Sequence, residues 1–244
     1  MAVRVGTCGW QYDDWRDAFY PHDLAKTKWL PAYAESFDTV ECDNAFYRLP
    51  KRETFETWAA SLPDGFTMAV KASRFLTHIK RLKDPEEPVK RLLESCTGLG
   101  DRLGPILVQL PPTMKADVER LDGCLRQFPR DVKVAVEPRH DTWWTDDVRR
   151  VLERHAAALT WSDRLGKPAA PMWRTTSWGY VRLHQGREEF PPDYGNSTLR
   201  RWLRQIDETW SPSDEVLVYF NNDPGAAAVR NAKSLRSMTN RLVS

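Results

Sequence analysis

The sequence predicts an α/β protein built as a single TIM-type (β/α)8-like barrel, with parallel strands inside and helices outside. Its 244 residues suit this fold, which typically takes about 250. Eight short apolar runs recur along the chain, and helical patterns fill most of the gaps between them. No linker or shift in composition divides the chain, so we expect one domain over residues 1–244.

The predicted strands are short, largely apolar and rich in valine, as buried parallel strands usually are. In chain order they are Val3–Cys8, Phe37–Cys42, Phe66–Val70, Pro105–Leu110, Val132–Val136, Ala157–Ser162, Tyr180–His184 and Val216–Phe220. Because helical patterns separate most of them, we expect parallel rather than antiparallel pairing.

The predicted helices lie between these strands and show apolar residues at helical spacing. They are Thr54–Leu62, Pro88–Leu99, Ala116–Phe128, Asp146–His155, Thr198–Trp210 and Pro224–Leu242. The first and second connections are irregular, since Pro21, Pro31 and Pro50 interrupt them. The sixth connection, Arg164–Ser177, is rich in proline and predicts no helix.

Three of the helix starts carry capping signals. Thr145 precedes two aspartates, which places an acceptor and negative charge at a helix start. Asn196 and Ser197 offer a cap for the next helix. Asp223 followed by Pro224 is typical of a capping residue and a proline at the first helical position, so we expect Asp223 to cap the last helix.

The composition excludes several classes of protein. A net charge of +2 gives no global reason for attraction to nucleic acid or membranes. The four cysteines form no C-x-x-C pair, which argues against zinc sites and predicts a reduced, cytoplasmic setting. No apolar stretch has the form of a signal peptide or the length of a membrane span, so we expect no membrane partner.

Polar residues gather where the predicted strands end, and these ends form the active site in a barrel of this kind. Tyr180, Arg182 and His184 share one face of the seventh strand, while Val181 and Leu183 share the other. The same alternation applied to the other strands predicts an inner ring of Glu41, Lys71, Gln109, Glu137, Arg139, Arg182 and His184.

Glu137 is the predicted centre of this ring. With cations beside it, the carboxylate is expected to stay ionised as a base, nucleophile or ligand. Arg139 and Arg182 would stabilise negative charge, His184 would transfer protons, and Glu41 would supply a second carboxylate. The alternative is a structural network in which the two glutamates neutralise the lysine and arginines of the ring.

A divalent metal is a candidate cofactor, and no other cofactor is indicated. Glu41, Glu137, Asp163 and His184 are donors that suit magnesium, manganese or zinc. Against a metal, the sequence has no H-x-H or H-E-x-x-H spacing, and three cations share the predicted site. The identity of any metal is left open.

Further residues are candidates for ligand binding. The basic segment after the third strand holds Lys71, Arg74 and His78, with Phe75 among them, and is either a solvated loop or a landing surface for an anionic polymer. Trp10 and Trp143 are candidates for stacking on a sugar or base. The remaining ligand-binding candidates are Gln109, Asp163, Asn221 and Asn222.

Several segments resemble the domain-of-unknown-function 72 family, also called YecE-like proteins. They include GTCGW at Gly6–Trp10, VKASRFLTH at Val70–His78, VAVEPRHDTWW at Val134–Trp144 and VYFNND at Val218–Asp223. The resemblance implies a TIM-type barrel but brings no established activity. Its characteristic residues match here as Glu41, Lys71, His78, Gln109, Glu137, Arg139, Asp163, Arg182, His184, Asn221, Asn222 and Asp223. Cys8 departs from the pattern, since serine is common there.

These observations support three hypotheses for function. The leading one is a hydrolase that acts on an anionic substrate, such as a phosphodiester or nucleic acid, at the carboxyl ends of the strands. The second is a glycoside hydrolase that uses the Glu41 and Glu137 pair. The third is a non-catalytic module that binds nucleic acid or a metabolite. The sequence predicts neither the oligomeric state nor the particular substrate.

Overall fold

The computed structural model describes residues 2–186 and 192–240 of the chain. The chain forms two compact units and passes between them several times. The first unit comprises Met1–Glu41, Trp161–Ala169 and Ser177–Ser244, and the second comprises Cys42–Thr160 and Ala170–Thr176. Both units combine strands with helices.

The sheet of the first unit has five strands in the order β1-β10-β9-β7-β8. The strands are β1 (Ala2–Thr7), β7 (Trp161–Arg164), β8 (Lys167–Pro168), β9 (Trp178–Leu183) and β10 (Glu215–Phe220). β10 pairs in parallel with both β1 and β9, and β7 pairs in parallel with β9. β8 is the exception, because it folds back on β7 as an antiparallel hairpin.

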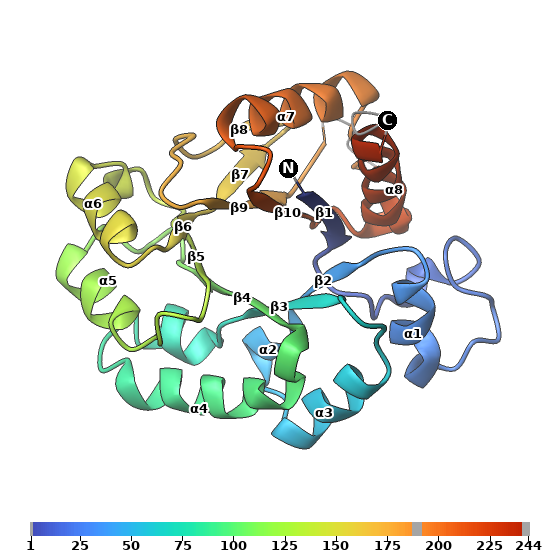
Figure 1. Ribbon diagram of the computed structural model, residues 1–244, viewed down its shortest axis with the longest axis horizontal. Coiled ribbons are helices and arrows are strands. Elements are labelled where there is room, and N and C mark those ends of the chain that lie inside the picture. Colours follow the sequence, from blue (N-terminus) through green and yellow to red (C-terminus); the bar gives the residue numbers. More distant parts are fainter. Residues whose placement is uncertain (1, 187–191, 241–244) are drawn as a thin grey trace. The chain divides into compact units, whose positions relative to one another are not determined.

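Helices of the first unit cover its parallel strands (Figure 1). They are η1 (Asp13–Trp15), η2 (Lys26–Lys28), α1 (Trp29–Ala34), α7 (Asn196–Thr209), η6 (Pro224–Ala226) and α8 (Ala227–Asn240). α8 packs on β1 and β10, and α7 packs beside α8. The apolar face of α7 is buried through Leu199, Trp202 and Ile206, at the spacing expected of an amphipathic helix.

The second sheet has five strands in the order β2-β3-β4-β5-β6. The strands are β2 (Thr39–Cys42), β3 (Thr67–Lys71), β4 (Leu103–Gln109), β5 (Val134–Glu137) and β6 (Ala158–Leu159). Strands β3 to β6 are parallel to their neighbours. Residues before Cys42 in β2 belong to the first unit.

Helices also alternate with the strands of the second unit, and α3 to α6 lie on one side of strands β3 to β6 (Figure 1). The helical segments are α2 (Asn44–Tyr47), α3 (Arg52–Ala60), the π-helix η3 (Phe75–Ile79), α4 (Glu86–Cys96), η4 (Thr97–Arg102), α5 (Val118–Leu125), η5 (Asp141–Trp143) and α6 (Asp146–Arg154). Thr145 caps α6 by accepting a hydrogen bond from the Val148 amide at 3.3 Å.

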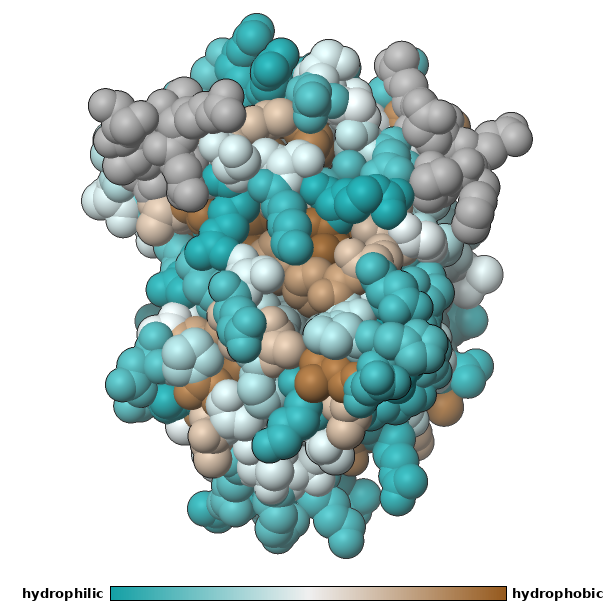
Figure 2. Space-filling model, turned by 90° about the vertical axis from the view of Figure 1, so that its right-hand side faces the viewer, coloured by the Kyte–Doolittle hydropathy of each residue, from teal (hydrophilic) through white to brown (hydrophobic). Residues whose placement is uncertain are grey.

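Most of the strands lie in the buried core. All six residues of β9 are buried, as are all four of β5, because strands covered on both faces have no solvent side. Figure 2 shows one face of the molecule, where hydrophilic side chains cover most of the surface and hydrophobic ones appear in patches between them. No helix in the described ranges is long and apolar enough to cross a membrane.

The α/β class and the parallel strands that the sequence predicts are confirmed. Each predicted strand and helix has a counterpart, although the sixth run divides at Thr160 into β6 and β7. As predicted, no helix lies between β7 and β9. Closure of the two sheets into one barrel, and the single domain, stay predictions. The last residues of the predicted helix ending at Leu242 lie outside the described residues.

The predicted cap at Asn196 and Ser197 is wrong, and the predicted cap at Asp223 is confirmed only in its position before Pro224. Gly195 occupies the N-cap of α7, and neither Asn196 nor Ser197 makes a capping hydrogen bond there. The Asp223 side chain makes no capping hydrogen bond to η6. Its backbone already has helical dihedral angles, whereas a capping side chain needs an extended backbone. The Gly225 amide donates instead to Asp14, at 3.0 Å.

Candidate functional site

The carboxyl ends of three neighbouring strands place polar side chains at one edge of the second sheet. Lys71 is the last residue of β3, Gln109 of β4 and Glu137 of β5. The parallel register pairs Gln109 directly with Glu137. Because parallel strands end at a common edge, these residues form the base of a polar site.

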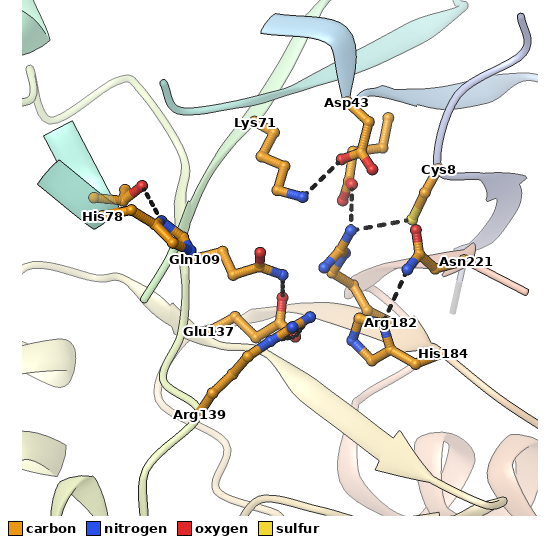
Figure 3. A network of polar contacts seen from close by, with 12 residues as sticks. Cys8, Asp43, Lys71, His78, Gln109, Glu137, Arg139, Arg182, His184 and Asn221 are labelled. Atoms are coloured by element: carbon orange, nitrogen blue, oxygen red, sulfur yellow. Dashed lines mark hydrogen bonds and ion pairs between the residues drawn. The ribbon is translucent and has the colours of Figure 1, made fainter. Parts of the chain in front are cut away.

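Glu137 is buried, and other polar groups of the second unit hold its carboxylate (Figure 3). The Gln109 amide donates to Oε2 at 2.9 Å. The Arg139 guanidinium donates to Oε1 from Nε at 3.3 Å and from Nη2 at 3.2 Å. The Arg139 side chain is 38% exposed, so it can contact a solvent-borne anion while it holds Glu137.

Lys71 lies close to an acid and an aromatic ring that the sequence pattern did not single out. Its Nζ is 3.2 Å from Oδ1 of Asp43 (Figure 3). The same ammonium group lies 4.6 Å from the centre of the Phe46 ring, within range of a cation–π interaction. Asp43 follows β2 directly and Phe46 belongs to the short helix α2, so the β2–α2 segment completes the surroundings of Lys71.

His78 belongs to the π-helix η3, and four cationic side chains lie near enough to act on its charge. Burial lowers its pKa below the usual value, and the charges of Lys71, Arg139, Arg74 and Arg81 lower it further. Its Nδ1 is 2.9 Å from the Thr77 hydroxyl. The imidazole is therefore neutral near pH 7 and can donate or accept a hydrogen bond without adding to the positive charge.

Positive charge exceeds negative charge around His78. Asp43 balances Lys71, and Glu137 balances Arg139. Arg74 and Arg81 have no carboxylate partner in the described part of the chain, and Arg81 donates only a long hydrogen bond of 3.4 Å to Thr113. We call Lys71, Arg74, Arg81 and Arg139, together with His78, the cationic cluster. Its surplus charge favours an anionic ligand.

The first unit holds a second set of polar groups, centred on a buried ion pair. Glu41 and Arg182 are both fully buried, and Arg182 Nη2 donates to Glu41 Oε1 at 2.8 Å. The Tyr180 hydroxyl donates to Oε2 at 2.6 Å. Burial raises the pKa of Tyr180, and the neighbouring Glu41 charge raises it further, so Tyr180 remains a hydrogen-bond donor.

Cys8 extends this network. Arg182 Nη2 lies 3.4 Å from its Sγ (Figure 3), and the backbones of Cys8 and Glu41 form a parallel bridge. The Gly9 amide adds a hydrogen bond to the Glu41 carbonyl at 2.8 Å. The thiol therefore occupies a buried polar position where a serine would fit equally well.

Asp163 fixes the backbone around His184. Its carboxylate accepts hydrogen bonds from the His184 amide at 2.6 Å, the Gly166 amide at 2.9 Å and the Tyr194 hydroxyl at 2.7 Å. Burial raises the pKa of Asp163 above its usual value, although these hydrogen bonds oppose the shift. With so many donors, Asp163 supports the local fold of the first unit.

Two asparagines at the end of β10 differ in their surroundings. The Asn221 amide lies 3.2 Å from Nδ1 of His184 and orients the imidazole (Figure 3). Asn222 is buried, and its amide donates to the Pro192 carbonyl at 2.9 Å and to Asn231 at 2.8 Å. Asn222 therefore stabilises the segment around Pro192, and Asn221 faces the histidine.

The two tryptophans predicted to stack on a substrate are buried. Trp143 donates from its indole nitrogen to the Met114 carbonyl at 2.8 Å and packs in the core of the second unit. Trp10 is also buried, and its carbonyl accepts a hydrogen bond from Tyr20 at 2.8 Å. Neither ring exposes a face in this structure.

The residues predicted as candidate metal ligands do not form a metal centre within either described unit. Among the residues that the structure describes, no group of three or more His, Cys, Asp or Glu side chains is placed to hold a metal ion. Asp163 is occupied by the donors described above, and Glu41 by Tyr180 and Arg182. We therefore derive no step through a bound metal.

The fold and these strand ends define an α/β protein with parallel sheets and polar groups at the carboxyl ends of its strands. The chain belongs to the DUF72 family, described as "Protein of unknown function DUF72", whose sequence model matches residues 4–243. The resemblance seen in the sequence is thus confirmed.

Relatives and solved structures agree with this assignment. The chain is 26% identical to UPF0759 protein YunF of Bacillus subtilis over 96% of this chain and 93% of that protein. It is 30% identical to UPF0759 protein YecE of Escherichia coli K12 over 46% of this chain and 41% of that protein. A DUF72 family protein of Thermotoga maritima matches 98% of this chain and 100% of its own, with a TM-score of 0.80 and 26% identity. A DUF72 family protein of Enterococcus faecalis shares the fold with a TM-score of 0.81 at 20% identity, over 98% of this chain and 95% of its own.

Proposed function

We propose that this protein is a hydrolase of anionic substrates and that it acts on a phosphodiester at the carboxyl ends of the strands. The observation that carries the proposal is the cationic cluster. Two of its arginines have no carboxylate partner among the described residues, and its charges lower the pKa of His78. A phosphodiester carries the negative charge that such a cluster would attract.

Each group at this site has a proposed role. Arg74, Arg81 and the exposed part of Arg139 bind the phosphate oxygens and stabilise the charge that develops in the transition state. Glu137, kept ionised by Arg139, is the base that activates a water molecule. Neutral His78 donates a hydrogen bond from its ring N–H to the leaving oxygen and so orients it, and solvent supplies the proton that the leaving alkoxide takes up. The attack of water forms a P–O bond, and the bond to the leaving alkoxide breaks.

We propose further that the two sheets are parts of one eight-stranded barrel. Two features support closure: the chain runs from β6 to β7 through the single residue Thr160, and Cys8, after β1, forms a parallel bridge with Glu41 of β2. In such a barrel Arg182 and His184 would join the cationic cluster, for charge stabilisation and proton transfer. The free cysteines support a cytoplasmic location.

Glycoside hydrolysis by Glu41 and Glu137 has weaker support. A retaining or inverting mechanism needs two carboxylates that reach the sugar. Glu41 is fully buried, and Tyr180 and Arg182 occupy its two oxygens. Its ionic partner Arg182 is fully buried as well, whereas the Arg139 side chain that holds Glu137 is 38% exposed. This difference favours a structural role for Glu41.

Inorganic phosphate should raise the pKa of His78. Without an anion, burial and the four nearby cations disfavour a protonated imidazole and hold the His78 pKa below its usual value. A phosphate bound among them cancels part of this field and favours protonation. The pKa of the His78 ring is measured by NMR pH titration, once in phosphate and once in chloride at equal ionic strength.

The Arg74→Gln variant should reduce this response, because it removes one of the two cations that lack a carboxylate partner. Arg130→Gln is the matched control, since Arg130 is exposed and precedes β5, at the opposite end of the strand from Glu137. An identical His78 pKa in phosphate and chloride would count against the proposed anion site.

A further inference from the structure

A groove of the second unit lies beside the cationic cluster and has an apolar floor. It encloses about 700 Å³ between α2, η3 and the start of α4. Its apolar lining comes from Phe46, Tyr47, Leu49, Phe75 and Ile79. The proposed chemistry uses none of these side chains.

The groove exposes large apolar side chains to solvent. Tyr47 is 80% exposed, Phe75 49% and Ile79 63%. In the described part of the chain, these three and Leu165 are the exposed large hydrophobic residues, so three of the four line one groove. Exposed apolar groups gathered in one place are typical of binding sites.

The backbone of η3 explains this exposure. Leu76 and Thr77 of this segment are buried, whereas Phe75 and Ile79 on either side of them are exposed. A π-helix is rare and is frequently found at functional sites. Here a single turn presents Phe75 and Ile79 to the groove and His78 to the cationic cluster.

Phe46 connects the groove with the cationic cluster. Its ring packs against Tyr47 at 5.0 Å and against His78 at 4.9 Å between centroids, in both cases edge to face. Lys71 lies above the same ring. Arg74 also belongs to both places, since it lines the groove and lowers the pKa of His78. A molecule could therefore contact the aromatic groove and the cations together.

The charges that line the groove favour an anion. Asp84 pairs with Lys80 at 3.1 Å, and Glu87 pairs with Arg91 at 2.7 Å. Three cations and two acids line the groove, which leaves a surplus of one positive charge, that of Arg74. Exposed aromatic faces beside a surplus of cations suit unpaired bases on a phosphodiester backbone.

We propose that this groove is a base-stacking subsite for single-stranded nucleic acid. The bases would stack on Tyr47 and Phe75 while the cationic cluster holds an adjoining phosphate. This inference rests on the proposed function, because it names the substrate class of the same site. It requires unpaired bases, so a duplex, whose bases are already stacked, binds more weakly.

Fluorescence anisotropy with two labelled strands of equal length tests this subsite. One is a short oligothymidylate, and the other is an abasic strand with the same sugar-phosphate backbone. The Tyr47→Ala and Phe75→Ala variants should each weaken oligothymidylate binding about tenfold and change abasic binding less than about twofold. Leu165→Ala is the matched control, since it removes an exposed hydrophobic side chain outside the groove.

The outcomes separate the two proposals. Equal affinity of the wild-type protein for the two strands, or unchanged oligothymidylate affinity in both variants, would overturn the stacking subsite. The subsite would also be overturned if the protein bound neither strand but bound an uncharged hydrophobic peptide, and if the Tyr47→Ala and Phe75→Ala variants bound that peptide more weakly. Stacking-dependent binding with no hydrolysis would support the subsite and overturn the proposed function. Unchanged thermal unfolding of the variants confirms that they are folded.

Discussion

Replacing Glu137 with glutamine should lower phosphodiester hydrolysis by about 1,000-fold, the range in which general bases contribute. Glutamine has nearly the same shape, and its amide oxygen can still accept hydrogen bonds from Arg139. Its amide nitrogen would then face Gln109, whose side-chain amide can turn so that its oxygen accepts. The glutamine that replaces Glu137 cannot take a proton from water. The loss should therefore appear in kcat, measured with a chromogenic phosphodiester, while thermal unfolding changes by only a few degrees.

Glu208→Gln is the control for this variant, because Glu208 is an exposed acid near the end of α7. It should retain full activity. A Glu137→Gln protein that is strongly destabilised yet as active as the wild type would instead identify Glu137 as part of a structural network. If the Glu137→Gln protein were as active and as stable as the wild type, Glu137 would be neither the general base nor part of a structural network.

Replacing Arg182 with methionine should cost about 3–5 kcal/mol of stability, because it leaves the Glu41 carboxylate buried without its cationic partner. For a chain of this size the expected fall in Tm is roughly 10 °C. Thermal unfolding measures it. Arg52→Met is the matched control, since the pair of Arg52 with Glu56 is exposed and should contribute less than about 1 kcal/mol.

The double variant Glu41→Gln with Arg182→Met should recover much of this loss, because it buries no uncompensated charge. Recovery would show that the cost of Arg182→Met comes from the stranded carboxylate. If the double variant were less stable than Arg182→Met alone, the ion pair would not be the source of the effect.

The sequence predicted the α/β fold because its strands are buried on both faces. Such strands read as continuous apolar runs, as Val216–Phe220 does in β10. The division of the sixth run at Thr160 leaves no trace in that pattern, since all the residues from Ala158 to Asp163 are buried. Helix caps were predicted less well, because a capping hydrogen bond depends on the local backbone and not only on the residue type.

The polar strand ends were predictable, but their partners were not. Alternation along β9 placed Tyr180 and Arg182 on one face. Their contact with Glu41 joins segments 139 and 141 residues apart, which no local pattern encodes. Asp43 was likewise missed as the partner of Lys71, although its position directly after a predicted strand was a usable signal.

The aromatic groove could not be predicted from the sequence. The sequence predicted stacking by Trp10 and Trp143, named Phe75 only as part of the basic segment, and did not indicate Tyr47, whereas the exposed rings are Tyr47 and Phe75. α2 has only four residues, too few to show a helical period, and a π-helix does not follow the 3.6-residue repeat. Exposure of these rings is a property of the tertiary structure.

Cleavage of an end-labelled oligothymidylate by the purified protein tests the central claim most directly. The reaction is run with added magnesium or manganese and separately with a chelator, and products are separated by length. We expect shortened products from the wild-type protein, and far fewer from the Glu137→Gln and Arg74→Gln variants. No shortened products under any of these conditions, or equal cleavage by the Glu137→Gln protein, would contradict it.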